Sequence, residues 1–417
     1  MPDETAPQDL TLSSAAVGSI QRRTVGVLAA GQVLGGVAFG ATVSLGALLA
    51  ADLSGAEELS GLATASVTLG AALCAIPLAR LAARRGRRFA LTLGNLFALV
   101  GIAVVITAAA IRSFPLLLVG VVLIGAGNAG NLQSRFAATD LSAPGLRGRD
   151  LGTVVWATTV GGVLGPLLLT PGDAVGSLLG MPELTGSYAF SIVAQTIAFV
   201  LYLFGLRPDP LQTAQRLARE RPVAPGGVVE EDHPVVARYA IFAVAGSHVV
   251  MASVMAMTPV HLSHLDPANV TTIVGVTIAL HVFGMYGLSP LFGILADRWG
   301  RVHTILLGQA VLAASMLVAV LAPQSSLAVL IALLLLGLGW SAATVSGAAL
   351  LTESTESSRR PRRQGFSDTI MTSSAAAGAV LAGVVLGWVG YGGLALSALV
   401  IVICIVTLSP YARLPRA

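Results

Sequence analysis

Two histidines, His248 and His281, stand inside long apolar stretches of the chain and have the chemistry to carry protons. An imidazole titrates near pH 6.5, so a ring held between two compartments can take up a proton on the acidic side and release it on the other. No Asp or Glu lies near the middle of the same stretches. A neutral ring that hydrogen-bonds to a nearby hydroxyl, such as Ser247 or Thr277, is the alternative interpretation, and the sequence does not choose between the two.

A second set of polar side chains could bind a small molecule. In "GAGNAGNLQSR", Asn128, Asn131 and Arg135 recur at i, i+3 and i+7, which places them on one face of a helix. Gln32 and Trp156 could join them from neighbouring helices. Such a site is mildly polar and lacks an acid, so it predicts neutral, weakly acidic or amphipathic ligands rather than polycations. Hydrogen bonds between helices are the alternative role for each of these side chains.

Two methionines extend the predicted binding site. Met251 and Met255 share a helical face with His248 and offer adaptable apolar surface. A thioether and an imidazole could also bind a soft metal. However, the next histidine, His261, lies about 13 residues beyond His248, or roughly 20 Å along a helix, so one compact site cannot include both rings. We therefore expect no metal site and no cofactor.

Composition indicates that these residues belong to membrane helices. Of 417 residues, 55% are hydrophobic and 11% are charged, whereas a soluble chain carries roughly a quarter charged residues. Apolar runs of about 20 residues are long enough to cross a bilayer as helices, and no strand pattern competes with them. All 24 basic residues are arginine, and the net charge of +4 gives no reason to expect a nucleic-acid partner.

The chain divides into twelve apolar spans, so the predicted fold is an all-α membrane protein of two six-helix pseudo-repeats. Residues 1–206 form the N-terminal half, 207–237 a cytoplasmic linker rich in Pro and charge, and 238–417 the C-terminal half. With the N-terminus inside, Arg112 is the one arginine on the outer side, in agreement with the positive-inside rule, so both termini are expected in the cytoplasm. The predicted spans lie near Val25–Ala50, Ser60–Leu78, Phe89–Ile111, Phe114–Ala138, Leu151–Leu169, Tyr188–Leu206, Tyr239–Leu262, Val270–Leu295, Val302–Leu321, Leu327–Leu351, Thr369–Val389 and Tyr391–Leu408.

A charged hairpin occurs once in each half. "GILADRWGR" begins at Gly293, and "ARLAARRGR" begins 214 residues earlier at Ala79. "LLGLG" at Leu335 likewise follows "LIGAG" at Leu123 by 212 residues. A shared offset between short matches is what a duplicated six-helix unit would leave.

These residues resemble the Major Facilitator Superfamily, and the resemblance covers essentially the whole chain. Its hallmark is G-x-x-x-D-R-x-G-R in a cytoplasmic loop between two helices. The resemblance implies a twelve-helix secondary transporter whose two halves rock against each other and form a gate at the cytoplasmic side. Asp140 and Glu353 are predicted to be acidic residues of this gate. The second hairpin keeps the whole motif and the first keeps part of it, so the predicted gate residues are Gly293, Asp297, Arg298, Gly300 and Arg301 with Arg84, Gly86 and Arg87.

The span near Leu151–Leu169 carries a second resemblance. Gly152, Gly161, Gly165 and Pro166 fit the antiporter motif of the drug/proton exporters. Glycines four apart allow close helix contact, and a proline bends the span. The sequence departs from that motif where Leu169 and Thr170 replace a glycine pair, and Val121 stands where those exporters carry an arginine.

The first hairpin has Ala83 where the second has Asp297. In this family the acid rests over the amino end of a helix in the opposite half when the cytoplasmic side is closed, so Asp297 is expected at the start of the Leu151–Leu169 helix. The arginines that begin the Thr369–Val389 helix would face those of the first hairpin without an acid between them. We therefore expect the resting protein to be open to the cytoplasm, and Ala83→Asp to favour closure.

The resulting functional prediction is a proton-coupled exporter of lipophilic or amphipathic small molecules, in the inner (plasma) membrane, acting as a monomer and not as an enzyme. A proton-coupled uptake symporter for a small metabolite is the first alternative. A sensor or scaffold that uses a transporter fold without transport is the second, because a fold does not prove a function.

Overall fold

The computed structural model describes residues 14–55, 59, 61–220, 232–265 and 270–412, and within these residues it is helical throughout, without a strand. Glycine-rich apolar sequence explains this, because only helices satisfy every backbone polar group inside one apolar segment. The N-terminal half comprises α1 (Ser14–Ser54), α2 (Gly61–Arg85), α3 (Arg87–Ala110), α4 (Phe114–Ala137), η2 (Pro144–Leu146), α5 (Arg147–Leu167), α6 (Leu169–Leu178) and α7 (Ser187–Gly205). The remainder comprises α8 (Pro210–Glu220), α9 (Pro234–Leu265), α10 (Val270–Tyr286), α11 (Ser289–Trp299), α12 (Arg301–Leu321), α13 (Ser326–Glu353), α14 (Arg360–Thr407) and η3 (Ser409–Ala412).

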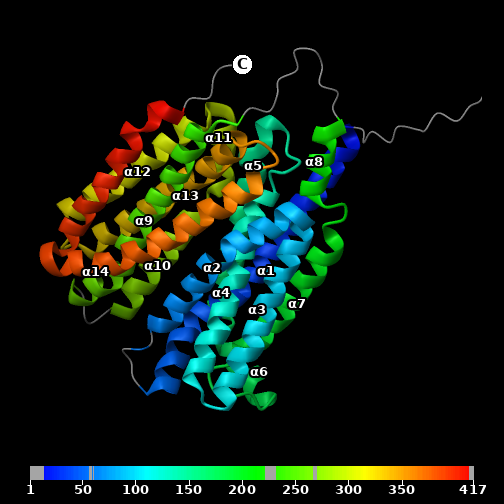
Figure 1. Ribbon diagram of the computed structural model, residues 1–417. Helices are drawn as coiled ribbons and strands as arrows, with labels where there is room; N and C mark the ends of the chain where they lie inside the picture. Colours follow the sequence, from blue (N-terminus) through cyan, green and yellow to red (C-terminus); the bar gives the residue numbers. More distant parts are fainter. Residues whose placement is uncertain (1–13, 56–58, 60, 221–231, 266–269, 413–417) are drawn as a thin grey trace, which may run out of the picture.

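Ten helices in the described part of the chain are long and apolar enough to cross a membrane. One of them, α14, is 48 residues long and contains Gly390 with φ 70° and ψ −176°. A straight helix of that length would measure about 72 Å, more than twice the roughly 30 Å hydrocarbon core. Figure 1 shows the chain reversing there, so α14 accounts for two predicted spans. Since α5 is not among the ten, the total of twelve crossings stays a prediction, while the all-helical fold is confirmed for the described residues.

The same close helix contact recurs in the two halves. A Cβ at Gly70 would lie 2.0 Å from the Val122 carbonyl oxygen, so α2 approaches α4 backbone to backbone. At Gly284, 214 residues later, a Cβ would lie 2.7 Å from the Leu334 carbonyl oxygen, and α10 approaches α13 in the same way. Small residues permit this approach, and its recurrence supports the predicted duplication.

The two halves meet along two helix pairs. Helix α2 packs along α14, and α5 packs along α11. In Figure 1 the start of α5 and the end of α11 lie together, and the helices of the two halves diverge away from that point. We call the end of the bundle that carries the 79–87 and 293–301 hairpins the motif end, and the opposite one the far end.

The predicted linker, residues 207–237, contains α8, a helix that the sequence did not predict. The Asp209 carboxylate accepts hydrogen bonds from the backbone N–H groups of Leu211 and Gln212 at 3.0 and 3.1 Å, at the start of α8. It also accepts one from the Arg88 N–H at 2.7 Å, at the start of α3. A carboxylate satisfies unpaired N–H groups at helix starts, so Asp209 ties α8 to the motif end.

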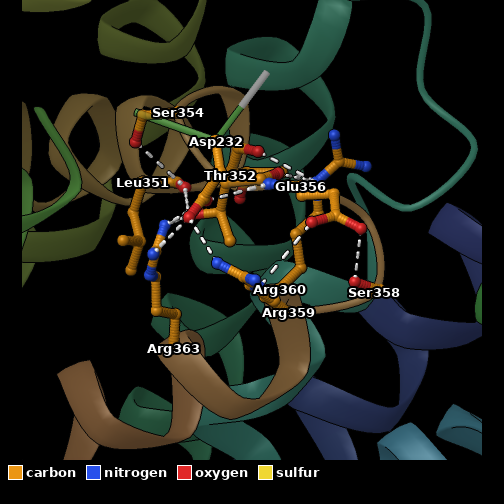
Figure 2. Close-up of polar contacts among 10 residues, drawn as sticks. Asp232, Leu351, Thr352, Ser354, Glu356, Ser358, Arg359, Arg360 and Arg363 are labelled. Atoms are coloured by element: carbon orange, nitrogen blue, oxygen red, sulfur yellow. Dashed lines mark hydrogen bonds and ion pairs between the residues drawn. The ribbon is translucent and has the colours of Figure 1, made fainter. Parts of the chain in front are cut away.

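Asp232, which precedes α9, is bound to the start of α14 (Figure 2). Its carboxylate accepts hydrogen bonds from Arg363 at 2.5 and 2.7 Å and from Arg359 at 3.1 Å. The adjacent backbone is fixed as well, because the His233 N–H donates to the Ser354 carbonyl at 3.0 Å. Asp232 therefore neutralises arginines at the start of α14.

The hydrogen bonds from Arg363 hold the pKa of the Asp232 carboxyl below its usual value of 3.8. A lowered pKa in the folded state adds stability that is complete above the unfolded pKa and is lost as the pH falls through the folded one. We expect Asp232→Asn to lower the free energy of unfolding by about 1 kcal/mol at neutral pH. The difference from wild type should shrink as the pH falls below 3.8.

Thermal unfolding of the purified protein across this pH range measures the effect. Asp52→Asn is the matched control, because the Asp52–Arg112 pair is exposed, with side chains 47% and 66% accessible. Such a pair contributes little. A difference between Asp232→Asn and wild type that is constant at every pH would contradict the prediction.

Candidate functional site

A cavity of about 340 Å³ lies between the two halves. Its lining comes from α1, α2, α4 and α5 on one side and from α9, α10, α13 and α14 on the other. This volume is at the lower end of the range for small-molecule sites. The residues that line it are Gln32, Gly36, Phe39, Val67, Thr68, Ala71, Asn128, Asn131, Leu132, Arg135, Val155, Thr158, His248, Ala252, Tyr286, Trp340, Thr344, Val345, Met371, Thr372, Ala375, Ala376 and Ala379.

The N-terminal half contributes amides and one cation. Asn128, Asn131 and Arg135 of α4 line the cavity together, as their spacing predicted. Gln32 of α1 is there too, and its Nε2 donates to the Thr158 hydroxyl of α5 at 3.2 Å. These groups offer hydrogen bonds in an otherwise apolar wall.

The C-terminal half contributes an aromatic cluster. The Trp340 indole N–H donates to His248 Nδ1 at 2.8 Å, and Tyr286 meets Trp340 edge to face with ring centroids 5.7 Å apart. Because Nδ1 accepts this bond, a neutral His248 carries its proton on Nε2, and protonation of Nδ1 would break the bond. Aromatic faces with a few polar groups suit a planar organic ligand.

Other predicted residues lie outside the cavity. His281 is 0% exposed, and its Nδ1 donates to the Leu333 carbonyl of α13 at 2.8 Å. Met251 is buried in the hydrophobic core of the C-terminal half, and Met255 packs against that core. Trp156 is 44% exposed. Of the two histidines, only His248 is placed to meet a ligand in the cavity.

An ion pair that the sequence did not predict closes the motif-end side of the cavity. Arg135 binds Asp368 of α14, with side chains 5% and 1% exposed. Asp140, the acidic residue nearest to Arg135 in the sequence, binds Arg87 instead. Since α4 ends and α14 begins at the motif end, the Arg135–Asp368 pair lies between the cavity and that end. It joins the two halves directly.

Asp297 joins the halves at the motif end. Its carboxylate accepts hydrogen bonds from the backbone N–H groups of Gly148 and Arg149, at 2.9 and 2.8 Å, in the first turn of α5. The placement expected from the resemblance is thus present. A carboxylate at a helix start is stabilised by unpaired N–H groups and by the helix dipole. Arg301 then connects Asp297 to Glu353, at 2.5 and 2.7 Å.

The other hairpin makes its cross-half contact differently. Arg87 is fully buried, and its Nε donates to Asp140 at 2.9 Å. Its Nη2 donates to the side-chain oxygen of Gln364 on α14, in the opposite half, at 2.6 Å. In the first hairpin, Arg87 is the donor and the opposite half provides the acceptor. In the second hairpin, Asp297 is the acceptor and the opposite half provides the donors.

Our expectation that the facing arginines have no acid between them is wrong, because the fold brings an acid to them. Arg363 and Arg359 bind Asp232, and the Arg360 Nε donates to the carbonyls of Thr352 and Thr355 at 2.9 Å each. The conformation observed is closed at the motif end, where we expected it to be open. Asp232 was missed because it precedes α9 in sequence and reaches the arginines only in the fold.

The remaining predicted gate residues shape the hairpins. Gly86 and Gly300 have φ values of 89° and 100°, a region that favours glycine, so each hairpin can turn directly into the next helix. Arg84 and Arg298 have exposed side chains.

Comparison with known proteins gives the family. The model of the Major Facilitator Superfamily matches residues 27–288 and 269–416. The chain belongs to the Major Facilitator Superfamily. This is a family of transporters and not of enzymes.

Relatives of this superfamily member cover nearly its full length. The uncharacterized MFS-type transporter YddS of Bacillus subtilis (strain 168) is 37% identical, over 92% of this chain and 89% of that protein. The riboflavin transporter RfnT of Brucella anthropi is 29% identical, over 88% of this chain and 90% of that protein. The crystal structure of the human organic anion transporter MFSD10 (TETRAN) matches with a TM-score of 0.74 and 18% identity, covering 93% and 99% of the two chains, which shows a shared fold.

The glycines of the resemblance to drug/proton antiporters lie at helix contacts of this superfamily member. A Cβ at Gly161 would lie 2.8 Å from the Gly36 Cα of α1. Gly152 faces α11, where its carbonyl accepts a hydrogen bond from the Ser289 hydroxyl at 3.0 Å. The surroundings of Gly165 and Pro166 lie outside the described part of the structure, although α5 ends at Leu167, just after the proline. Membership of the antiporter branch stays a prediction.

Proposed function

We propose that this chain is a secondary active transporter that moves amphipathic small organic molecules with a planar aromatic part, by alternating access and coupled to protons. The observation that carries the proposal is the cavity lined from both halves above a closed motif end. Rocking of the halves would open the motif end and expose the same cavity from the other side. The arginine-rich motif end would face the cytoplasm of the plasma membrane.

The lining supports the substrate class. Trp340 and Tyr286 offer aromatic faces, while Gln32, Asn128 and Asn131 offer amides on the opposite wall. A planar ring with polar substituents could use both walls at once. Riboflavin, the compound in the name of the relative RfnT, has this character and is the first compound to test.

Two directions of transport remain candidates. The glycine pattern of α5, Gly152 and Gly161, favours export by proton exchange through its resemblance to the antiporters. The buried Arg135–Asp368 pair favours movement of substrate and proton in the same direction, for reasons given below. Of the predicted proton carriers, His248 is favoured over His281 because it lines the cavity.

Reconstitution into proteoliposomes tests the proposal. With an internal pH dye and an imposed pH gradient, riboflavin and a panel of planar amphipathic molecules should drive proton movement in wild type and not in empty liposomes. Inward or outward accumulation of the fluorescent riboflavin gives the direction. His248→Gln should lower the rate severalfold, and a shifted pH dependence of transport in this variant would assign the coupled proton to this ring.

Each outcome separates the alternatives. Opposed movement of proton and substrate supports export by exchange, and parallel movement supports uptake. Substrate movement that ignores the pH gradient overturns proton coupling alone. No movement of any compound, with binding retained, would favour a sensor or scaffold.

A further inference from the structure

Arg135 is the only permanently charged side chain among the described residues that line the cavity, and no carboxylate is among them. It is 4% exposed. Its Nη2 donates to Asp368 and lies 3.9 Å from the Met371 sulfur, and its guanidinium carbon lies 4.9 Å from the centre of the Phe136 ring, while its Nε has no hydrogen-bond partner among the described residues. A guanidinium binds a carboxylate or similar oxyanion through a fork of N–H donors. The cavity therefore presents one strong donor to an anion.

Asp368 depends on Arg135. It is 0% exposed, and of its two carboxylate oxygens Oδ1 accepts from Arg135, whereas Oδ2 has no hydrogen-bond partner in the described part of the structure. A buried carboxylate that loses its cation is costly and must gain either water or a proton. With the motif end closed, a proton restores neutrality without moving the halves.

The other charged groups near Asp368 do not replace Arg135. Arg87 of α3 exerts a weaker attraction on Asp368 and is held by Asp140 and Gln364. Among the elements that pack against α14, α9 brings His248 close to Arg135. The arginines of α2, which are Arg80, Arg84 and Arg85, are exposed, as is His303 of α12. Glu353 of α13 binds Arg301 of α12.

We propose that Arg135 binds the anionic group of an aromatic oxyanion substrate, such as a carboxylate, and that Asp368 takes up one proton when the anion replaces it. This inference rests on the proposed function and names its substrate class. The Arg135 N–H groups exchange the Asp368 oxygen for the substrate oxygen, and the proton comes from the solution to which the cavity is open. Charge in the site is unchanged, since one anion and one proton enter together.

The sign of coupling follows from this exchange. Because anion and proton each favour binding of the other, they occupy the same loaded state and cross together. An anion that bound without the proton would leave Asp368 charged and unpartnered in the closed motif end. The opposing interpretation is that the pair only fastens the two halves, in which case ligand charge would not matter.

Binding to the purified full-length protein in detergent decides between the two. The probes are benzoate, 1-naphthoate and the amide of each, with the acids fully ionised at the pH values used. Calorimetric titration in two buffers of different ionisation heat gives both affinity and proton uptake. We expect an acid to bind at least about tenfold more tightly than its amide near pH 6. The affinity for the acid should fall by up to about tenfold for each unit by which the pH rises, and one proton should be taken up per anion bound.

Variants assign these effects to the two residues. Arg135→Gln should abolish the preference for the acid while the amide binds within about twofold of wild type, and Arg135→Lys should keep part of the preference. Asp368→Asn should bind the acid without proton uptake and with a flat pH profile, and Asp368→Glu should restore both. Arg112→Gln and Asp52→Asn, an exposed ion pair at the far end, are matched controls that should behave as wild type.

Three results overturn the proposal. They are a series in which no acid binds more tightly than its amide, a preference that survives in Arg135→Gln, and proton uptake that survives in Asp368→Asn. The proposed function fails separately. Riboflavin transport without acid preference would sink only the anion site, whereas proton-linked anion binding without any transport would sink only the transporter proposal.

Discussion

Replacing Gly293 with valine is expected to abolish transport and to hold the two halves apart at the motif end. A Cβ at Gly293 would lie 2.2 Å from the Gly148 carbonyl oxygen and 3.1 Å from the Arg149 backbone nitrogen. In the reverse direction, a Cβ at Gly148 would lie 2.5 Å from the Gly293 carbonyl oxygen. These are backbone atoms of α5 and α11, so no side-chain rotation can relieve the contact. The helices must separate.

Separation of α5 from α11 also removes the hydrogen bonds of Asp297. Its two bonds to the N–H groups of Gly148 and Arg149 exist only when the halves meet. Hydrogen bonds to a charged group contribute about 1.5–3 kcal/mol each. A loss of about 3 kcal/mol or more lowers the population of the closed motif end by about a hundredfold. Alternating access would then lack one of its two states.

Spin-label distances across the motif end measure this population. Labels on the exposed positions Leu146 and His303, in a background without Cys74 and Cys404, would report a longer distance in Gly293→Val, and Gly293→Ala should give an intermediate effect. Gly26→Val is the matched control, because nothing lies within 4 Å of a Cβ at that helical position. If Gly293→Val retained more than half of wild-type transport, the argument from close contact would fail.

The polar wall of the cavity could be predicted from sequence, and the aromatic wall could not. Asn128, Asn131 and Arg135 are polar residues in an otherwise small, apolar run, so their helical spacing reveals their common face. Trp340 and Tyr286 lie in helices that are apolar on every side, where periodicity gives no direction. Their polar edges inside a span were the available signal.

The sequence predicts that His281 lies within an apolar helix, and it does not predict which way the side chain of His281 points. His281 lies within α10, yet the backbone of α10 at that residue packs against α13, where a Cβ at Gly337 would lie 2.4 Å from the His281 carbonyl oxygen. This position follows Val67 by 214 residues, and Val67 makes the same contact with Gly125 in the N-terminal half. The repeat therefore explains why His281 faces a neighbouring helix.

Helix limits explain the missed acid. The sequence predicted a span from Thr369, which left Asp368 in a loop, whereas α14 begins at Arg360. Hydropathy cannot extend a helix through several charged residues. In the fold these charges are paired, Asp368 with Arg135 and Arg363 with Asp232, so the helix continues into the bundle. Such partners lie far apart in sequence and become visible only in the structure.

Gln364→Ala is expected to weaken closure of the motif end, and Ala83→Asp is expected not to strengthen it. Arg87 is buried, and Gln364 is its cross-half acceptor at 2.6 Å. The bond to Arg87 exists only in the closed conformation, because Gln364 belongs to the opposite half, whereas its bond to the Thr352 hydroxyl at 3.3 Å lies within its own half. A loss of about 1.5 kcal/mol would lower the closed population about tenfold.

Helix geometry gives a physical reason to reverse the expectation that Ala83→Asp would favour closure. Asp297 meets Gly148 and Arg149 in the first turn of α5, where N–H groups are unpaired. The equivalent residues 217 positions later, Gly365 and Phe366, lie inside α14, which begins at Arg360. Their N–H groups are already used by the helix. A carboxylate at position 83 would find no free N–H group there and could only compete with Gln364 for Arg87.

The same spin-label distances, with Gln212→Ala on the exposed face of α8 as the glutamine control, test both variants. A closed population that rises in Ala83→Asp would show that the motif needs its acid in both halves. A population unchanged in Gln364→Ala would show that Asp140 alone holds Arg87. The expected pattern, loss with Gln364→Ala and no gain with Ala83→Asp, would mean that this transporter closes its two hairpins by different chemistry. One hairpin uses a carboxylate on a helix start, and the other uses an amide on a buried arginine.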